Sequence, residues 1–128
     1  MHKQLIDKLI EEAQMGAEHA YCPQSEVPVG ASLLTRDGVI SRGCNFELMS
    51  QGMGASQVAM AKAFSEGFTD FQAICFWSEK ILPYPEGVEL QLLGELCPQI
   101  DIIVANNQTF TVHRLHDLAP FRRVVQND

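Results

Sequence analysis

Residues 29–46 read VGASLLTRDGVISRGCNF, two short apolar segments on either side of the tripeptide Arg36-Asp37-Gly38. An Asp-Gly pair between two such segments is a strong hairpin signal, because glycine adopts the positive φ that tight hairpin turns require. The stretch therefore predicts two antiparallel strands, at residues 29–35 and 39–46. They form the start of a sheet against which the rest of the chain is expected to pack.

Helical and extended patterns alternate on both sides of this hairpin. Before it, apolar residues recur every four positions and predict an amphipathic helix over residues 2–20. After it, residues 55–66 are apolar on nearly all sides, which is typical of a buried helix. Residues 71–77 (FQAICFW) form an unbroken apolar run, as expected of a central strand covered on both faces. The remaining predicted elements are a helix at 86–96, a strand at 101–105, a tight turn with positive φ at Asn106-Asn107, a strand at 109–112 and a last helical turn at 115–118.

This order of elements predicts an α/β fold. A hairpin followed by strands that alternate with helices indicates a three-layer α/β/α sandwich around one mixed sheet of five strands. The two crossovers through the central helices are expected to be right-handed. We expect a single domain over residues 1–128, with a frayed tail at residues 124–128.

The composition indicates a globular protein with no attraction for polyanions. The chain has 46% hydrophobic residues, and its 9 basic and 16 acidic residues give a net charge of −7. An acidic chain whose only adjacent basic pair is Arg122-Arg123 is a poor candidate for binding nucleic acid or an anionic membrane. No apolar run is long enough to span a membrane, and the first residues lack the apolar stretch of a secretory signal. We therefore expect a cytoplasmic protein.

Four cysteines, Cys22, Cys44, Cys75 and Cys97, are widely spaced, with no Cys-x-x-Cys pair. Zinc sites usually draw on such close pairs, because two ligands on one turn are already positioned for the metal. The spacing therefore predicts four reduced thiols and no zinc site built from them.

Three strings carry a resemblance to a known family. They are HAYCPQSEVPVGASLLTRDG at residues 19–38, SRGCNFELMSQG with GASQVAMAKAFSEG at 41–67, and PEGVELQLLGELCP with DIIVANN at 85–107. Together, and in this order, they resemble the cytidine deaminase family of small zinc-dependent nucleoside deaminases, from about Leu5 to Phe121. The resemblance implies the α/β/α fold and a homo-oligomer, either a tetramer or a dimer.

The resemblance also locates the family's chemistry, and this sequence departs from the family there. Members carry a Cys/His-x-Glu at the start of the second helix and a Pro-Cys-x-x-Cys at the start of the third; the cysteines and histidine bind zinc and the Glu shuttles protons. In this chain Gly54, Glu86 and Glu89 stand at the three zinc-ligand positions, and Ser56 stands at the position of the catalytic Glu. Glycine offers no ligand, and a serine hydroxyl is no general base without its own activator. The sequence therefore predicts no catalytic residue and no metal cofactor.

Other positions of the pattern suggest a nucleoside pocket. By resemblance, Asn45 and Glu47 match residues that hydrogen-bond the ribose; the alternative is that Asn45 shapes the turn and Glu47 is a solvated carboxylate. Val27 stands where the family has a phenylalanine against the pyrimidine, so base recognition should be weaker or altered. Glu86 and Glu89, three residues apart, either hold a hard cation such as Mg²⁺ or only place favourable charge at a helix N-terminus. For Ser56 the alternative to a nucleophile is a helix cap.

These observations predict a catalytically inactive homologue that binds a nucleoside-like small molecule or acts in assembly, alone or with an active relative. The alternative is a hydrolytic cytidine deaminase with an atypical site, which would need zinc.

Overall fold

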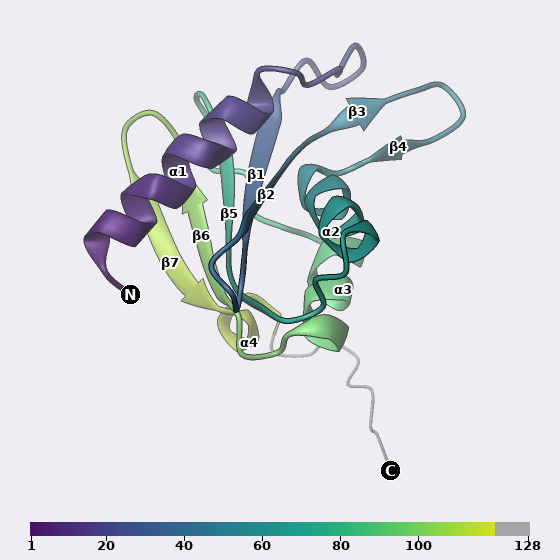
Figure 1. Cartoon of the computed structure of the whole chain (residues 1–128). Coiled ribbons are helices and arrows are strands. Elements are labelled where there is room, and N and C mark those ends of the chain that lie inside the picture. Colours follow the sequence, from purple (N-terminus) through teal and green to yellow (C-terminus); the bar gives the residue numbers. More distant parts are fainter. Residues whose placement is uncertain (120–128) are drawn as a thin grey trace.

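A five-stranded sheet forms the centre of the computed structural model, which describes residues 1–119 (Figure 1). The strand order is β2-β1-β5-β6-β7; β5 and β6 run parallel, and every other neighbouring pair is antiparallel. The predicted mixed sheet is therefore confirmed, whereas the tail at 124–128 lies outside the described residues. The strands are β1 (Val29–Thr35), β2 (Ile40–Cys44), β5 (Phe71–Ser78), β6 (Asp101–Ala105) and β7 (Phe110–Arg114).

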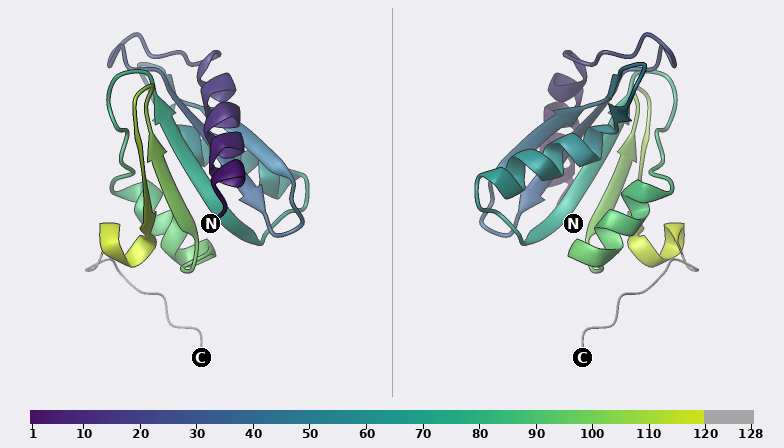
Figure 2. Two further views of the ribbon diagram at one scale, coloured as in Figure 1. Left: turned by 90° about the vertical axis from the view of Figure 1, so that its left-hand side faces the viewer. Right: turned by 90° about the vertical axis from the view of Figure 1, so that its right-hand side faces the viewer.

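Helices cover both faces of this sheet, which gives the three predicted layers (Figure 2). The helix α1 (Lys3–Ala17) lies on one face, and α2 (Ala55–Ser65) and α3 (Val88–Leu96) lie on the other. A short α4 (Leu115–Leu118) follows β7. No helix of residues 1–119 is both long enough and apolar enough to cross a membrane.

The central strand β5 explains why its sequence is apolar throughout. Ile74 and Phe76 point into the cluster under α2 and α3, while Cys75 and Trp77 point into the cluster under α1. Neighbouring residues of a strand face opposite sides of the sheet, so a strand covered on both sides needs apolar residues at every position.

Two glycines let the helices approach the sheet closely. A Cβ on Gly30 would lie 1.8 Å from the carbonyl oxygen of Ala13 in α1, and one on Gly43 would lie 2.2 Å from the carbonyl oxygen of Ala55 in α2. Both contacts are with helix backbone, so no side chain can move aside to relieve them. Gly43 in β2 thus allows the start of α2 to pack directly against this strand.

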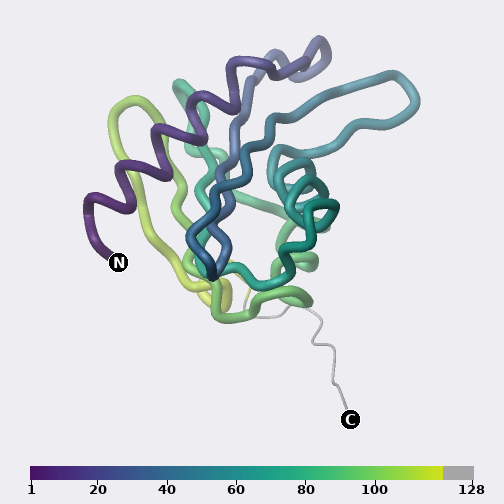
Figure 3. Tube along the Cα trace, in the orientation of Figure 1, coloured from purple at the N-terminus to yellow at the C-terminus, as the bar shows by residue number. Residues whose placement is uncertain are grey.

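A short ribbon after β2 was not predicted. The strands β3 (Phe46–Glu47) and β4 (Gly52–Met53) pair with each other and leave the main sheet, and the chain trace shows this excursion extending away from the layers (Figure 3). The sequence predicts one continuous strand over residues 39–46, which the structure divides into β2 and β3. The ribbon carries residues from the sheet edge over the start of α2.

Three local predictions were wrong. The helix α1 ends at Ala17, not at residue 20, because the following amide groups bond three residues back and tighten the chain into a turn. One face of α2 is exposed, including Phe64, because the helix packs on the sheet with its opposite side only. The Asn106-Asn107 turn needs no positive φ: the Asn106 side-chain oxygen accepts the N–H groups of residues 108 and 109, which closes the turn.

Candidate functional site

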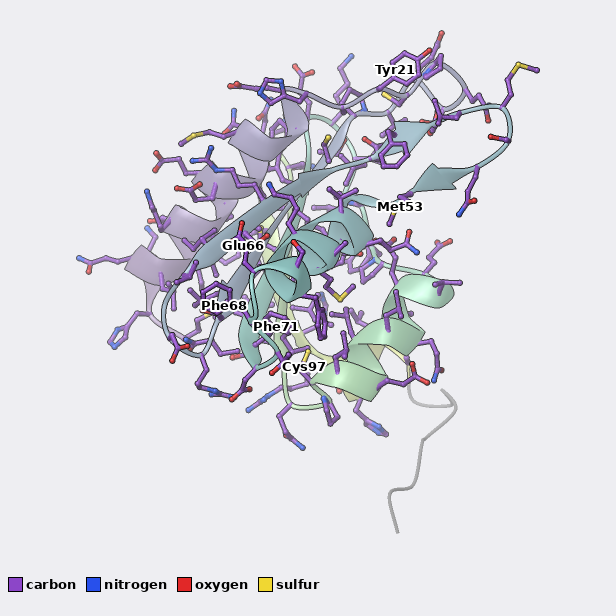
Figure 4. All side chains as sticks on the ribbon, turned by 45° about the vertical axis from the view of Figure 1, so that its right-hand side comes forward. Tyr21, Met53, Glu66, Phe68, Phe71 and Cys97 are labelled. Carbon is purple, nitrogen blue, oxygen red and sulfur yellow. The ribbon has the colours of Figure 1, made fainter. Side chains whose placement is uncertain are left out.

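A cavity of about 600 Å³ lies between the β3–β4 ribbon, the start of α2 and the segment that leads into α3. This volume is within the range of sites for small ligands. Figure 4 shows Met53 on the ribbon and Cys97 at the far end of the α2–α3 layer. The cavity is lined by Val29, Asn45, Phe46, Glu47, Gly52, Met53, Gly54, Ala55, Phe76, Ile81, Leu82, Pro83, Tyr84, Glu86 and Glu89.

Aromatic and aliphatic side chains make up most of the wall. Phe46 comes from the ribbon, Phe76 from β5, and Tyr84 from the segment before α3. The position of Tyr84 is fixed from the side of β7: its hydroxyl lies 3.2 Å from the Thr111 hydroxyl, and its ring meets that of His113 edge-on at 5.5 Å. The wall therefore offers flat apolar surfaces, which suit a planar ligand.

Asn45 holds two segments of backbone together at the edge of the cavity. Its side-chain oxygen accepts the Val29 N–H at 2.9 Å, and its amide nitrogen donates to the Val27 carbonyl at 2.9 Å. The side chain thus fixes the loop before β1 onto the end of β2. This geometry favours the turn-shaping alternative for Asn45.

Glu47 anchors the same loop from the ribbon. One carboxylate oxygen accepts the N–H groups of Gln24 at 2.9 Å and Ser25 at 2.8 Å. The Ser25 hydroxyl and these amide groups hold the pKa of Glu47 below its ordinary value. Glu47 is therefore an ionised loop anchor that also lines the cavity, and not only a solvated carboxylate.

The starts of α2 and α3 meet beneath the cavity. Ser56, in the first turn of α2, is completely buried and donates a hydrogen bond from its hydroxyl to the carboxylate of Glu89, in the first turn of α3. Gly54 precedes α2, and its own N–H bonds the side chain of Gln57. Three of the four positions that the sequence singled out thus lie side by side.

Glu89 and Glu86 share the cavity but differ in their surroundings. Burial raises the pKa of Glu89 above its ordinary value, and the nearby Glu86 adds to this, while the hydroxyl and amide of Ser56 act in the opposite direction. Glu86 is exposed and comes before Gly87, where α3 is capped. The prediction that Glu86 and Glu89 lie on one helix was therefore wrong: the positive φ of Gly87 turns the chain between them.

The structure brings together most, though not all, of the positions that the sequence singled out. Asn45, Glu47, Gly54, Glu86 and Glu89 line one cavity, and Ser56 lies directly beneath it. Val27 lies outside this lining; its carbonyl is occupied by Asn45, and its neighbour Glu26 has a positive φ of 61°. Leu82 and Tyr84 were missed because they sit in an irregular segment, where no periodicity marks which side chains face inward; Phe46 was missed because it lies on the short ribbon that was not predicted.

The four cysteines take no part in this site. All are free, and none lines the cavity. Burial raises the pKa of Cys75 and of Cys97 to about 12, which keeps both as neutral thiols at ordinary pH. Within residues 1–119, no group of three or more histidine, cysteine or acidic side chains is placed to hold a metal ion.

Comparisons with known proteins agree with this architecture. A model of the cytidine and deoxycytidylate deaminase zinc-binding region matches residues 3–83. The cytidine deaminase of Halalkalibacterium halodurans is 43% identical over 93 residues, 70% of each chain. That of Sporosarcina psychrophila is 39% identical over 95 residues, 72% of this chain and 70% of its own.

Solved structures give the same picture. The crystal structure of cytidine deaminase from Burkholderia pseudomallei matches with a TM-score of 0.84 and 32% identity, covering 94% of this chain and 98% of that one. Cytidine deaminase from Mycobacterium tuberculosis matches with a TM-score of 0.78 and 27% identity, covering 91% of this chain and 94% of that one.

Proposed function

Because the chain belongs to the cytidine and deoxycytidylate deaminase family, we propose that it is a member that binds a nucleoside-like small molecule without deaminating it. One observation carries this proposal: the Ser56 hydroxyl donates a hydrogen bond to the Glu89 carboxylate. These two residues stand at positions where the family resemblance places the catalytic Glu and a zinc ligand.

The donor atoms at these positions do not fit a zinc ion. Protein zinc sites use at least three side-chain ligands, predominantly thiolates and imidazoles. Gly54 contributes no side chain, Glu86 and Glu89 contribute carboxylates only, and one of those carboxylates is already bonded to Ser56. We therefore derive no reaction step through a metal at this site.

Ser56, at the position of the family's proton shuttle, does not fit that role either. A general base must reach the proton it removes and must have a suitable pKa. Ser56 is completely buried and its hydroxyl donates a hydrogen bond to Glu89, so it is not placed to act as a base toward a ligand in the cavity. Among residues 1–119, no histidine lines the cavity to activate the Ser56 hydroxyl.

Two features of the cavity support a small, uncharged ligand. Its aromatic walls suit a planar ring, and its polar groups are mostly carboxylates, which accept hydrogen bonds from hydroxyl and amino groups. No lysine, arginine or histidine of residues 1–119 lines it. Phosphate groups would thus meet carboxylates with no cation to balance them, so a nucleoside is favoured over a nucleotide.

The test combines turnover with binding. Cytidine incubated with the purified protein should keep its ultraviolet band, while cytidine or uridine in excess should raise the thermal unfolding midpoint, since a ligand of the folded state stabilises it. A positive control comes from the same chain: Gly54→Cys, Ser56→Glu, Glu86→Cys and Glu89→Cys together install the family's donor set. Turnover by the unaltered protein would contradict the proposed inactivity, and a midpoint that no nucleoside moves would contradict the proposed binding.

We also propose that the chain forms a homo-oligomer. Apolar side chains are exposed at the tip of the β3–β4 ribbon, where Met49 is fully exposed and Leu48 is about half exposed, and on the outer face of α2 at Phe64. Burial of such surface against a second copy would remove it from water. Light scattering tests this: a monomer at micromolar concentration would contradict it. Hetero-oligomers of this chain with an active relative would be detected as a complex that contains both chains when the two are produced together.

A further inference from the structure

The carboxylate of Glu89, from α3, lies against the start of α2. The first turn of a helix has N–H groups without partners inside the helix. At α2 the residue that would normally supply a side-chain cap is Gly54, which has none. Glu89 instead accepts a hydrogen bond from the hydroxyl of Ser56, 33 residues away in sequence. A carboxylate at this end of a helix is also favoured by the helix dipole.

The Glu89 carboxylate also fills the space beside Gly54. A Cβ built on Gly54 would lie 2.9 Å from Oε2 and 3.0 Å from Cδ of Glu89. The backbone of Gly54 is extended, with φ of −74°, so its conformation does not itself require glycine. The space beside Gly54 is instead taken by the neighbouring carboxylate, so a side chain at position 54 would have to displace that carboxylate from its place against Ser56.

We infer that Glu89 replaces the metal ion as the group that joins the starts of α2 and α3, with Gly54 and Ser56 as its matched partners. In zinc-binding relatives the family resemblance places the ligands on these same two helix starts. Here the Glu89 side chain joins the two helix starts through its hydrogen bond with Ser56, and Gly54 leaves space for the Glu89 carboxylate. The inference rests on the metal-free half of the proposed function and is independent of which ligand binds.

The test is a double-mutant cycle on stability, measured by chemical unfolding. Ser56→Ala and Glu89→Ala should each lower the folded-to-unfolded ratio at least about tenfold, as expected for a hydrogen bond to a carboxyl group. The double variant should lose little more than the worse single variant, because both remove the same interaction. Glu86→Ala is the matched control: it removes a carboxylate from the same cavity and should change the ratio less than about twofold.

A second double-mutant cycle combines Gly54→Ala with Glu89→Ala. Its first variant adds a methyl group and does not remove a buried polar group. Gly54→Ala should destabilise the unaltered protein and be nearly neutral in Glu89→Ala, where the space is vacant. Additive losses in both cycles, or a loss in Glu86→Ala equal to that in Glu89→Ala, would overturn the inference. A chelator tests the metal-free site of the proposed function separately from the role of Glu89. If adding the chelator lowers the thermal unfolding midpoint of the unaltered protein, a bound metal stabilises the site and the metal-free premise is wrong.

Discussion

Replacing Asn45 with alanine should cost about 2–3 kcal/mol of the free energy of unfolding. The side chain makes two hydrogen bonds of 2.9 Å to backbone, one to Val29 and one to Val27. Each contributes about 1 kcal/mol net, and leaving the partly buried backbone partners unpaired adds up to about 1 kcal/mol more in total. For a chain of this length, such a loss lowers the thermal midpoint by roughly 10 °C. Urea unfolding measures it directly, with an unchanged denaturant slope.

Asn107→Ala is the control for this experiment. Asn107 is exposed, and its backbone N–H, which alanine retains, donates a hydrogen bond to the Glu79 carbonyl. Its replacement should stay within about 0.5 kcal/mol. If Asn45→Ala were equally harmless, the Asn45 side chain would not hold the loop, and the alternative role in ligand binding would be favoured.

Three further predictions concern pH and packing. Burial raises the pKa of Glu89, so over a range of pH the folded state keeps a proton that the unfolded state has lost. The free energy of unfolding should therefore fall as pH rises from the ordinary glutamate pKa through the raised value. In urea unfolding at a series of pH values, Glu89→Gln should abolish this fall. The hydrogen bond with Arg42 is the main cause that lowers the pKa of Glu12. The stability that ionised Glu12 contributes is therefore present above the ordinary glutamate pKa and is lost as pH falls through the lowered pKa. Acid unfolding of Glu12→Gln should lack this loss, and the same dependence of stability on pH in the variant and the unaltered protein would refute the prediction. Gly30→Ala should cost at least about 3 kcal/mol, because the new Cβ would meet the backbone of α1, and a thermal midpoint within a few degrees of the original would contradict that packing.

Much of the fold could be predicted from local patterns. The Asp37-Gly38 hairpin, the apolar β5 and the amphipathic α1 each carry a signal within a few residues, and the layers follow from their order. Errors arose where tertiary contacts decide the outcome. The exposed face of α2 also carries apolar residues, among them Ala61 and Phe64, so the pattern did not separate it from the buried face.

The candidate site could be predicted only in part. The resemblance singled out Gly54, Ser56 and Glu89 one by one, but their mutual fit depends on how two helix starts meet in space. Likewise, the sequence left open whether Asn45 binds a ligand or shapes the backbone, and the two hydrogen bonds of its side chain to backbone favour the second reading. Such interactions have no signature in spacing, since their partners lie on separate elements.

The metal content of the purified protein distinguishes a metal-free site from a zinc site at the starts of α2 and α3. The chain would be produced in zinc-supplemented medium, purified without chelator and measured by mass spectrometry of the elements, beside the variant that carries the four installed donor residues. Our account predicts only traces of zinc in the unaltered protein and retained zinc in the variant. One zinc ion per unaltered chain, removed by chelator together with a fall in the unfolding midpoint, would contradict it.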